Sequence, residues 1–215
     1  MPDRSIAHLR REYRHRALLE KKAPRNPLVL FQKWFSEALK AQVLDANAFA
    51  VSTVSKSGKP STRMVLLKGF DRDGFVFFTN YQSQKGREVE GKAVASLLFF
   101  WPQLSRQVRI EGRAKKVSAK ESDQYFQSRP RGAQLSTWAS HQSATVPSRE
   151  YLEKRMEVLE ALYQGRKIPR PPYWGGFRVA PSAIEFWQGR PNRLHDRLRY
   201  RRKNQGGWRL ERLAP

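Results

Sequence analysis

The chain has 215 residues, of which 39% are hydrophobic and 12% aromatic, which is enough to build a globular core. It contains no cysteine, which excludes disulfides, thiolate nucleophiles and cysteine-based metal or iron–sulfur sites and fits a cytoplasmic location. No apolar run approaches the roughly 18 residues of a transmembrane helix, and the N-terminus lacks the apolar core of a secretory signal. His8, His15 and His141 show no ligand spacing with one another or with carboxylates, so no metal is predicted.

The charge is strongly positive, with 42 lysines and arginines against 19 acidic residues and a formal net charge of +23. Such an excess favours anionic partners, and a basic nucleic-acid-binding protein is therefore the alternative function. No recognised nucleic-acid motif accompanies the charge, so binding of that kind is expected to be weak and non-specific.

Hydrophobic periodicity predicts helices followed by strands in the first half of the chain. Residues 4–22 carry apolar positions on one stripe, which predicts a basic amphipathic helix, and residues 28–43 show the clearest helical pattern. The period then changes to two. This change predicts strands at 48–55, 61–70 and 74–80, joined by hairpin turns.

The second half is predicted to contain a strand pair at 94–101 and 106–118, helices at 119–129 and 148–164, and two or three closing strands. Four apolar residues of the last helix are expected to face inward: Leu152, Met156, Leu159 and Leu162. Short antiparallel strands with helices at their ends, and no βαβ alternation, indicate an α+β barrel. We expect a single domain over residues 1–215, with residues 1–25 as a basic N-terminal arm.

The most unusual segment is 174–197, with the sequence WGGFRVAPSAIEFWQGRPNRLHDR. A short apolar run ends at a glycine and a proline, and Arg193, His195 and Arg197 follow at a spacing of two. If this part is extended, the three side chains share one face and form a concave anion site with a group that titrates near neutral pH. A solvated basic edge strand is the alternative interpretation.

No glycine-rich phosphate loop of the GxGxxG or GxxxxGK[ST] kind occurs, so a nucleotide-like cofactor must be held by side chains and strand backbone. The RMVLLK block at 63–68 offers both, because Arg63 and Lys68 bracket four apolar residues; a barrel strand with charged ends is the alternative. Tyr125 and Arg129 are likewise either phosphate ligands or a packing pair at a helix end.

These blocks together resemble the pyridoxamine 5′-phosphate oxidases, flavin enzymes that form pyridoxal 5′-phosphate. They occur in the family's order along nearly the whole chain: HLRREY at 8–13, RMVLLK at 63–68, FFTN at 77–80, SLLFFW at 96–101, RQVRIEG at 106–112, YFQSRPR at 125–131, WGGFRV, IEFWQG and RLHDR within 174–197, and RLAP at 212–215. The resemblance implies an antiparallel FMN-binding split β-barrel with flanking helices, of the α+β class. It also implies a homodimer with FMN between the subunits and no membrane partner.

The implied reaction converts pyridoxamine or pyridoxine 5′-phosphate to pyridoxal 5′-phosphate with O2, releasing H2O2 and, from the amine, ammonia. The residues that the resemblance places at FMN are Arg63, Met64, Val65, Leu66, Leu67, Lys68, Phe78, Thr79, Lys85, Gln107, Gln142, Ser143, Trp187 and Arg197. Those that it places at the substrate are Arg10 and Tyr13 in a mobile N-terminal lid, Lys68, Tyr125, Arg129, Arg193, Leu194 and His195. Arg193 is the candidate catalytic residue that orients the reacting C4′ substituent, with His195 assisting.

Two positions depart from the family's pattern. Gln84 stands where arginine is usual, so one cation for the flavin phosphate is absent. Ala133 stands where a serine usually hydrogen-bonds the substrate phosphate. Both differences concern affinity more than the type of reaction.

Overall fold

The structure is a computed structural model that describes residue 13 and residues 17–215. The chain divides into two compact units. Unit 1 comprises Met1–Asn47, Leu98–Ile110 and Ser182–Pro215, and unit 2 comprises Ala48–Leu97 and Glu111–Pro181. Among the described residues, nine strands form a sheet in the order β2-β1-β5-β6-β7-β4-β3, and β8 pairs with both β7 and β9. Three of these strands contribute residues to both units: β5 (Val94–Trp101), β6 (Arg106–Lys116) and β7 (Trp174–Gln188).

The first strands of unit 2 confirm the predicted hairpins and correct one boundary. β1 (Ala48–Val54) and β2 (Pro60–Leu66) pair antiparallel in a register that joins the residues at both ends. The strand predicted at 61–70 is instead broken, and β3 (Gly69–Asp71) follows separately. β3 pairs antiparallel with β4 (Gly74–Asn80) across a tight turn, in which the Asp71 side chain accepts from the backbone nitrogens two and three residues later.

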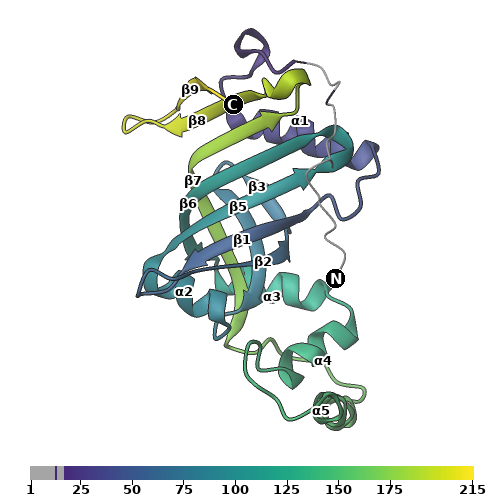
Figure 1. Ribbon diagram of the computed structural model, residues 1–215. Coiled ribbons are helices and arrows are strands. Elements are labelled where there is room, and N and C mark those ends of the chain that lie inside the picture. The colour runs from purple at the N-terminus through teal and green to yellow at the C-terminus, as the bar shows by residue number, and fades with distance from the viewer. Residues whose placement is uncertain (1–12, 14–16) are drawn as a thin grey trace, which may run out of the picture. The chain divides into compact units, whose positions relative to one another are not determined.

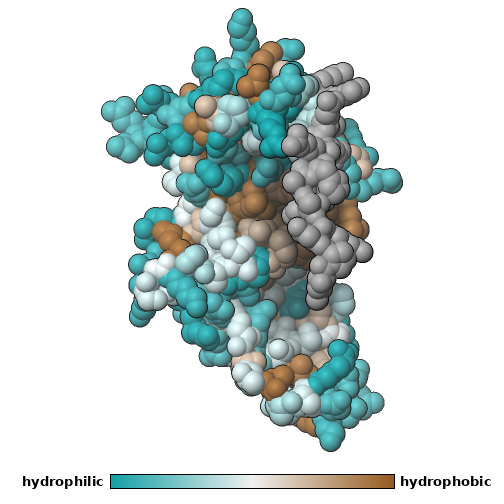
Figure 2. All heavy atoms as spheres, in the orientation of Figure 1, coloured by the Kyte–Doolittle hydropathy of each residue, from teal (hydrophilic) through white to brown (hydrophobic). Residues whose placement is uncertain are grey.

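Alternation along β5 sorts its side chains between the core and the surface. Ala95, Leu97, Phe99 and Trp101 are buried, while the exposed hydrophobic residues of the strand are Val94, Leu98 and Phe100. β2 likewise exposes Met64 and Leu66. Figure 2 shows hydrophobic side chains at the surface of the face that it views, between hydrophilic ones. Apolar strand residues that stay exposed in one chain are candidates for a contact with another chain.

Unit 1 contains the predicted helix 28–43, which is confirmed as α1 (Pro27–Lys40) and ends three residues early. Asn26 caps its first turn by accepting from the Leu28 nitrogen. Phe31 packs on Phe99, and Trp34 packs on Phe186, with ring centroids 5.2 Å apart in each pair. α1 therefore covers the aromatic core of unit 1.

Unit 2 contains four helices in the described chain: α2 (Gln84–Lys92), α3 (Ala119–Ser128), α4 (Arg131–Ala139) and α5 (Arg149–Leu162). α3 and α5 confirm two predicted helices, whereas α2 and α4 were not predicted. Figure 1 shows α3, α4 and α5 gathered at one end of the unit. Met156 and Leu159 pack against a small hydrophobic core at that end of unit 2, as predicted. Leu162 is 56% exposed, so the inward position predicted for it is wrong.

Two predictions of regular structure in unit 1 are corrected. Most of the predicted 4–22 helix, residues 4–12 and 14–16, lies outside the described residues. Residues 13 and 17–19 are described and are not helical, and the 3-10 turn η1 (Glu20–Lys22) follows them. The segment 193–197 is not extended throughout, because the strand begins only at Asp196. Arg193 closes the 3-10 turn η3 (Pro191–Arg193), and β8 (Asp196–Arg202) and β9 (Trp208–Leu213) come after it.

The reason for the second correction is local. Pro191 opens the turn, and Asn192 and Arg193 both take left-handed backbone angles, with φ of 55° and 60°. A strand cannot continue through two such residues. Within the described part of the chain, no helix is long and apolar enough to span a membrane.

Candidate functional site

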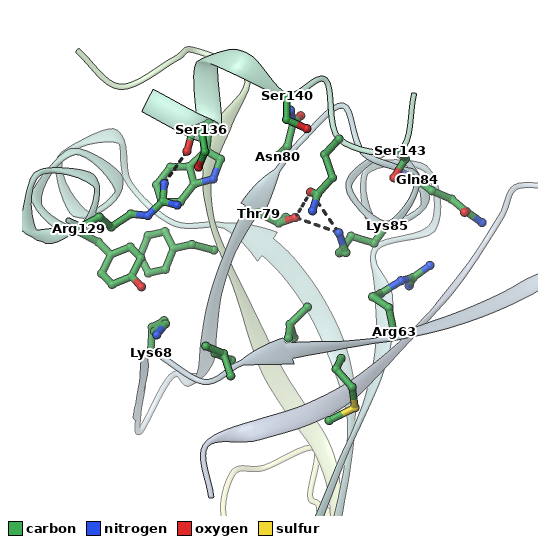
Figure 3. A pocket seen from close by; sticks show the side chains of 18 of the residues that line it. Arg63, Lys68, Thr79, Asn80, Gln84, Lys85, Arg129, Ser136, Ser140 and Ser143 are labelled. Carbon is green, nitrogen blue, oxygen red and sulfur yellow. Dashed lines mark hydrogen bonds between the residues drawn. The ribbon is translucent and has the colours of Figure 1, made fainter. Parts of the chain in front are cut away.

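A cavity of about 980 Å³ lies in unit 2, between β2, the end of β4, the start of α2, and the helices α3 and α4 (Figure 3). It brings together most of the residues predicted for FMN and for the substrate phosphate: Arg63, Met64, Val65, Leu66, Lys68, Phe78, Thr79, Lys85, Tyr125, Arg129, Gln142 and Ser143. Leu67 does not line it, because its side chain is buried in the core. The structure thus places these predicted residues around one cavity, and their roles at FMN and at the substrate stay predictions.

Lys85 supplies a buried cation at one end of the cavity. Its side chain is held by α2, whose first turn is capped by Ser83. The Nζ atom lies 3.2 Å from Thr79 Oγ1, 3.3 Å from Gln142 Oε1 and 3.4 Å from Ser83 Oγ, and all three partners are neutral. Burial, and then the charge of Arg63, lower the pKa of Lys85 to about 8. A buried ammonium among neutral oxygens fits an anionic ligand.

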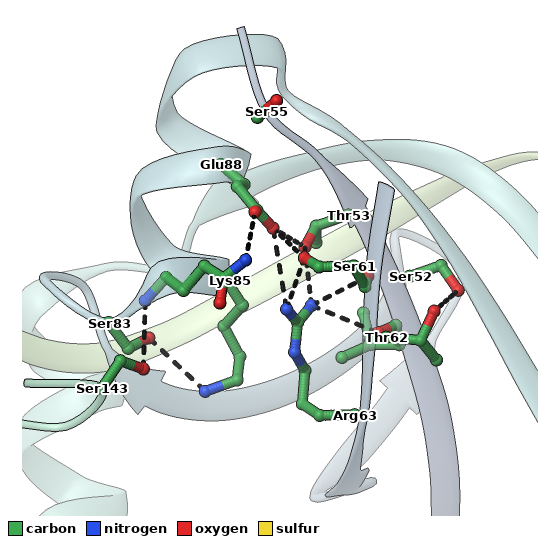
Figure 4. Close-up of polar contacts among 12 residues, drawn as sticks. Ser52, Thr53, Ser55, Ser61, Thr62, Arg63, Ser83, Lys85, Glu88 and Ser143 are labelled. Atoms are coloured by element: carbon green, nitrogen blue, oxygen red, sulfur yellow. Dashed lines mark hydrogen bonds and ion pairs between the residues drawn. The ribbon is translucent and has the colours of Figure 1, made fainter. Parts of the chain in front are cut away.

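Arg63 is the second cation at this end, and it is held by a polar network (Figure 4). It donates to Thr53 Oγ1 and to Ser61 Oγ, both at 2.6 Å, and lies 3.7 Å from the buried carboxylate of Glu88. Burial by itself would raise the pKa of Glu88, but hydrogen bonds from Ser61, Thr53 and Gln84 and the charge of Arg63 outweigh it and leave that pKa below its usual value. Arg63 is therefore fixed before any ligand arrives.

Gln84 belongs to the same network. Its Nε2 donates to Glu88 Oε1 at 2.9 Å, and its backbone nitrogen donates to Ser143 Oγ at 3.3 Å. The amide that replaces the family's usual arginine thus binds a carboxylate of this chain. The Ser143 hydroxyl accepts from Gln84, so its own proton remains available to a ligand.

The other end of the cavity combines a flat aromatic surface with two cations. Tyr125 stacks on Phe78 at 4.0 Å and lies nearly parallel to Trp174 at 6.1 Å. Lys68 Nζ is 5.9 Å from the Tyr125 ring, and the Arg129 guanidinium is 4.7 Å from the Trp174 ring. No carboxylate of the described residues forms an ion pair with Lys68 or Arg129, so their positive charge is available to a phosphate.

A smaller pocket of about 230 Å³ lies in unit 1 and contains three further predicted FMN residues, Gln107, Trp187 and Arg197. Glu185 on β7 accepts from Arg197 Nε at 2.8 Å and pairs with Arg109 at 2.9 Å. The other end of the Arg197 guanidinium donates to the Ala214 carbonyl at 2.8 Å. Arg197 is therefore held in one orientation by a buried carboxylate and by the C-terminal segment.

The predicted catalytic histidine also lies in unit 1, within an aromatic group. The His195 ring is 4.6 Å from Trp187, and Tyr13 meets both rings edge-on at 5.5 and 5.7 Å. His195 Nδ1 accepts from the Arg190 backbone nitrogen at 3.1 Å, which places the proton of the neutral ring on Nε2. Burial, and then the charge of Arg193, lower the pKa of His195 and favour that neutral form.

Arg193 and Leu194 are exposed beside this group, and Arg10 lies outside the described residues. A non-glycine residue with left-handed backbone angles costs free energy, and such residues cluster at functional sites. The conformation of Arg193 is therefore consistent with a functional role, although it was not visible as a pattern in the sequence.

Several residues of the site were missed by sequence reasoning. Trp174 forms part of the aromatic surface, Glu88 and Ser61 hold Arg63, and Thr137 contacts Arg129. Only the spacing of four between Gln84 and Glu88 was a usable signal, because residues so spaced meet on a helix. Trp174 and Glu88 contact Tyr125 and Arg63 from distant parts of the chain, whereas Ser61 and Thr137 lie only two and eight residues from their partners.

The sheet and the cation-lined cavity define an α+β protein of the antiparallel split-barrel class, as predicted. A solved FMN-binding protein from Nostoc punctiforme, described as related to pyridoxamine 5′-phosphate oxidase, shares this fold with a TM-score of 0.68 and 18% identity over 90% of this chain and 98% of that chain. PhzG from Burkholderia lata 383, solved in complex with tetrahydrophenazine-1-carboxylic acid, aligns with a TM-score of 0.88 and 33% identity over 94% of this chain and 99% of that chain.

Sequence comparison then specifies the family. The protein-family model described as pyridoxamine 5′-phosphate oxidase matches residues 35–163. The family model for the C-terminal dimerisation region of pyridoxine 5′-phosphate oxidase matches residues 174–215. The pyridoxine/pyridoxamine 5′-phosphate oxidase of Acaryochloris marina is 54% identical over 98% of this chain and 96% of its own length. The pyridoxine/pyridoxamine 5′-phosphate oxidase of Rubrobacter xylanophilus is 54% identical over 99% of this chain and 97% of its own length. The chain belongs to the pyridoxamine 5′-phosphate oxidase family, a family of oxidoreductases, which confirms the resemblance.

Proposed function

We propose that this chain oxidises pyridoxamine 5′-phosphate and pyridoxine 5′-phosphate to pyridoxal 5′-phosphate, with FMN as cofactor and O2 as electron acceptor. With the amine, substrate, O2 and water give the aldehyde, ammonia and H2O2, so two electrons pass from the C4′ carbon to oxygen. The strongest support is the cavity of unit 2, which has cations at both ends and apolar and aromatic side chains between them. The names of relatives that match along the full chain support the same reaction.

The residues present fit FMN. Arg63 and Lys85, with the Ser143 hydroxyl, offer charged and neutral donors to its phosphate, and the 64–66 segment offers apolar surface to a flat ring. When bound, FMN supplies a two-electron acceptor that O2 regenerates, and the protein supplies position and electrostatics. Gln107, Trp187 and Arg197, which line the pocket of unit 1, are the further residues assigned to the cofactor.

Two groups of residues are assigned to the substrate. Lys68, Tyr125 and Arg129 bind the phosphate through two cations and a phenol. Arg193 orients the C4′ substituent, and His195, neutral with its proton on Nε2, donates a hydrogen bond to it. Leu194, and the N-terminal Arg10 and Tyr13, exclude water from the bound ring.

A homodimer with FMN between the subunits is part of this proposal. The match of residues 174–215 to a dimerisation region supports it, and that region contains Trp187, Arg193, His195 and Arg197. The exposed apolar residues of β2 and β5 offer surface for such a contact. The comparisons favour the oxidase over the nucleic-acid-binding alternative, and the cytoplasmic location stays a prediction.

The absorption spectrum of the purified protein tests the proposal. We expect a yellow protein that releases about one FMN per chain and whose flavin bleaches when pyridoxamine 5′-phosphate is added without oxygen. Pyridoxamine, which lacks the phosphate, is the control and should bleach it far more slowly. A colourless protein that added FMN cannot colour would contradict the oxidase function.

A further inference from the structure

The guanidinium of Arg129 is held by a neutral side chain of α4. Arg129 Nη1 donates to Thr137 Oγ1 at 2.6 Å, and this is the only hydrogen bond that the guanidinium makes to the described residues. Thr137 is buried and lines the cavity of unit 2. Its hydroxyl proton goes to the Ala133 carbonyl at 2.9 Å, so a lone pair of the oxygen faces the guanidinium.

The same helix also fixes the backbone at Arg129. This residue follows the end of α3, and Gln134 Nε2 donates to its carbonyl at 2.9 Å and to that of Gln127 at 3.3 Å. The Trp174 ring supports one face of the guanidinium. The backbone of Arg129, the plane of its guanidinium and the direction of one of its N–H bonds are thus set before a ligand binds. This reduces the conformational entropy lost on binding.

A hydroxyl differs from a carboxylate in this position because it orients the arginine without neutralising it. Arg63, at the other end of the cavity, lies beside the carboxylate of Glu88. Arg129 keeps its full charge and its remaining N–H groups for an anion, and a phosphate binds a planar guanidinium best through two parallel hydrogen bonds.

Thr137 places a hydroxyl at the cavity on the same helix as Ala133, which has none. Ala133 lacks the hydroxyl that the family usually has, and it does not line the cavity, whereas Thr137 does. The two residues are four apart on α4 and therefore share one face of the helix.

We propose that Thr137 is a positioning residue that orients Arg129 toward the substrate phosphate, and that its hydroxyl compensates for the one absent at Ala133. This inference rests on the proposed function, because it assigns the phosphate of the substrate to Arg129. It adds a residue that makes the phosphate site specific for an oriented, dianionic group.

Three variants separate this role from a structural one. Thr137→Val removes the hydroxyl and keeps the branched shape, while Thr137→Ser keeps the hydroxyl. Ser128→Ala is the control, because the Ser128 hydroxyl donates to a backbone carbonyl, that of Tyr125 at 2.8 Å, and Ser128 does not line the cavity. FMN content and thermal unfolding of all three are expected to equal those of the wild type within error.

For Thr137→Val we expect KM for pyridoxamine 5′-phosphate to rise about tenfold, the usual effect of losing one hydrogen bond to a charged group. The kcat should change less than about twofold, because the phosphate is remote from C4′ and bound alike in the ground and transition states. Thr137→Ser and Ser128→Ala should behave as the wild type.

Calorimetric titration supplies a reading that does not depend on turnover. 4-Deoxypyridoxine 5′-phosphate, which has no group to oxidise at C4′, should bind FMN-loaded Thr137→Val about tenfold more weakly than the wild type. Unphosphorylated 4-deoxypyridoxine should bind both proteins equally.

An unchanged KM in Thr137→Val, or an equal loss of affinity for the unphosphorylated compound, would overturn the inference while leaving the oxidase function intact. A wild-type protein that neither oxidises pyridoxamine 5′-phosphate nor binds the phosphorylated analogue would overturn the proposed function and the inference together.

Discussion

In the cavity of unit 2, Lys68, Lys85 and Arg129 face neutral oxygens or aromatic rings, whereas in the pocket of unit 1 Arg109 and Arg197 share the carboxylate of Glu185. Burying a cation without a counter-charge costs free energy, so the buried ammonium of Lys85 fits a site that an anionic ligand completes. A carboxylate partner weakens the positive electrostatic potential of an arginine but fixes the orientation of its guanidinium. We infer that unit 2 recognises phosphate and that unit 1 orients groups at the reacting end.

The largest effect is expected in unit 1, at the proposed catalytic residue. Arg193→Ala should lower kcat/KM by at least about 100-fold, since an oriented, charged contact to the reacting substituent contributes a few kcal/mol. FMN should stay bound, because Arg193 does not line either pocket. Steady-state kinetics and the flavin spectrum measure both effects.

Arg201→Ala removes the same charge from an exposed position of the same unit and is the control. It should keep wild-type kcat/KM. If Arg193→Ala also kept it, the reacting end of the substrate would not lie in unit 1.

The next effect tests the uncompensated charge of Lys85 in unit 2. Burial lowers its pKa to about 8, and a bound phosphate would raise it again. Below pH 8 the ammonium is already charged, whereas above it each binding event must take up a proton. FMN affinity should therefore fall as the pH rises, approaching about tenfold per pH unit above 8.

Fluorescence titration of FMN between pH 7 and 9.5 measures this slope. Lys85→Arg should flatten it, because arginine stays charged throughout that range. A flat profile for the wild type would show that Lys85 does not contact the phosphate.

The smallest effect concerns the paired arginines of unit 1. Glu185→Gln keeps the volume and an acceptor oxygen for Arg197 but removes the charge, so FMN affinity should fall only about three- to tenfold. Glu211→Gln is the control. The Glu211 carboxylate accepts from Arg199 at 2.8 Å and lines neither pocket, so this variant should leave FMN binding unchanged. Tighter FMN binding in Glu185→Gln would mean that the carboxylate repels the cofactor rather than holding Arg197.

The elements that the sequence predicted well are those with strong periodicity. α1 repeats apolar residues at helical spacing, and β1, β4 and β5 carry dense apolar runs. α2 was missed because QKGREVEGK contains one apolar residue and two glycines, and α4 because RGAQLSTWA contains a glycine and no regular apolar spacing. They form because Val89 and Leu135 are buried by neighbouring elements.

The sequence by itself determined the class of the protein and the residue types of the site, because ordered blocks such as RMVLLK, YFQSRPR and RLHDR are local strings that can be read without a structure. Only the tertiary structure decided how each cation is used. Glu88 reaches Arg63 across 25 positions, Glu185 reaches Arg109 across 76, and Thr137 meets Arg129 only because α4 turns back on the end of α3. Periodicity reports which side of one element is apolar, whereas charge compensation depends on which elements pack together, and no local pattern encodes that.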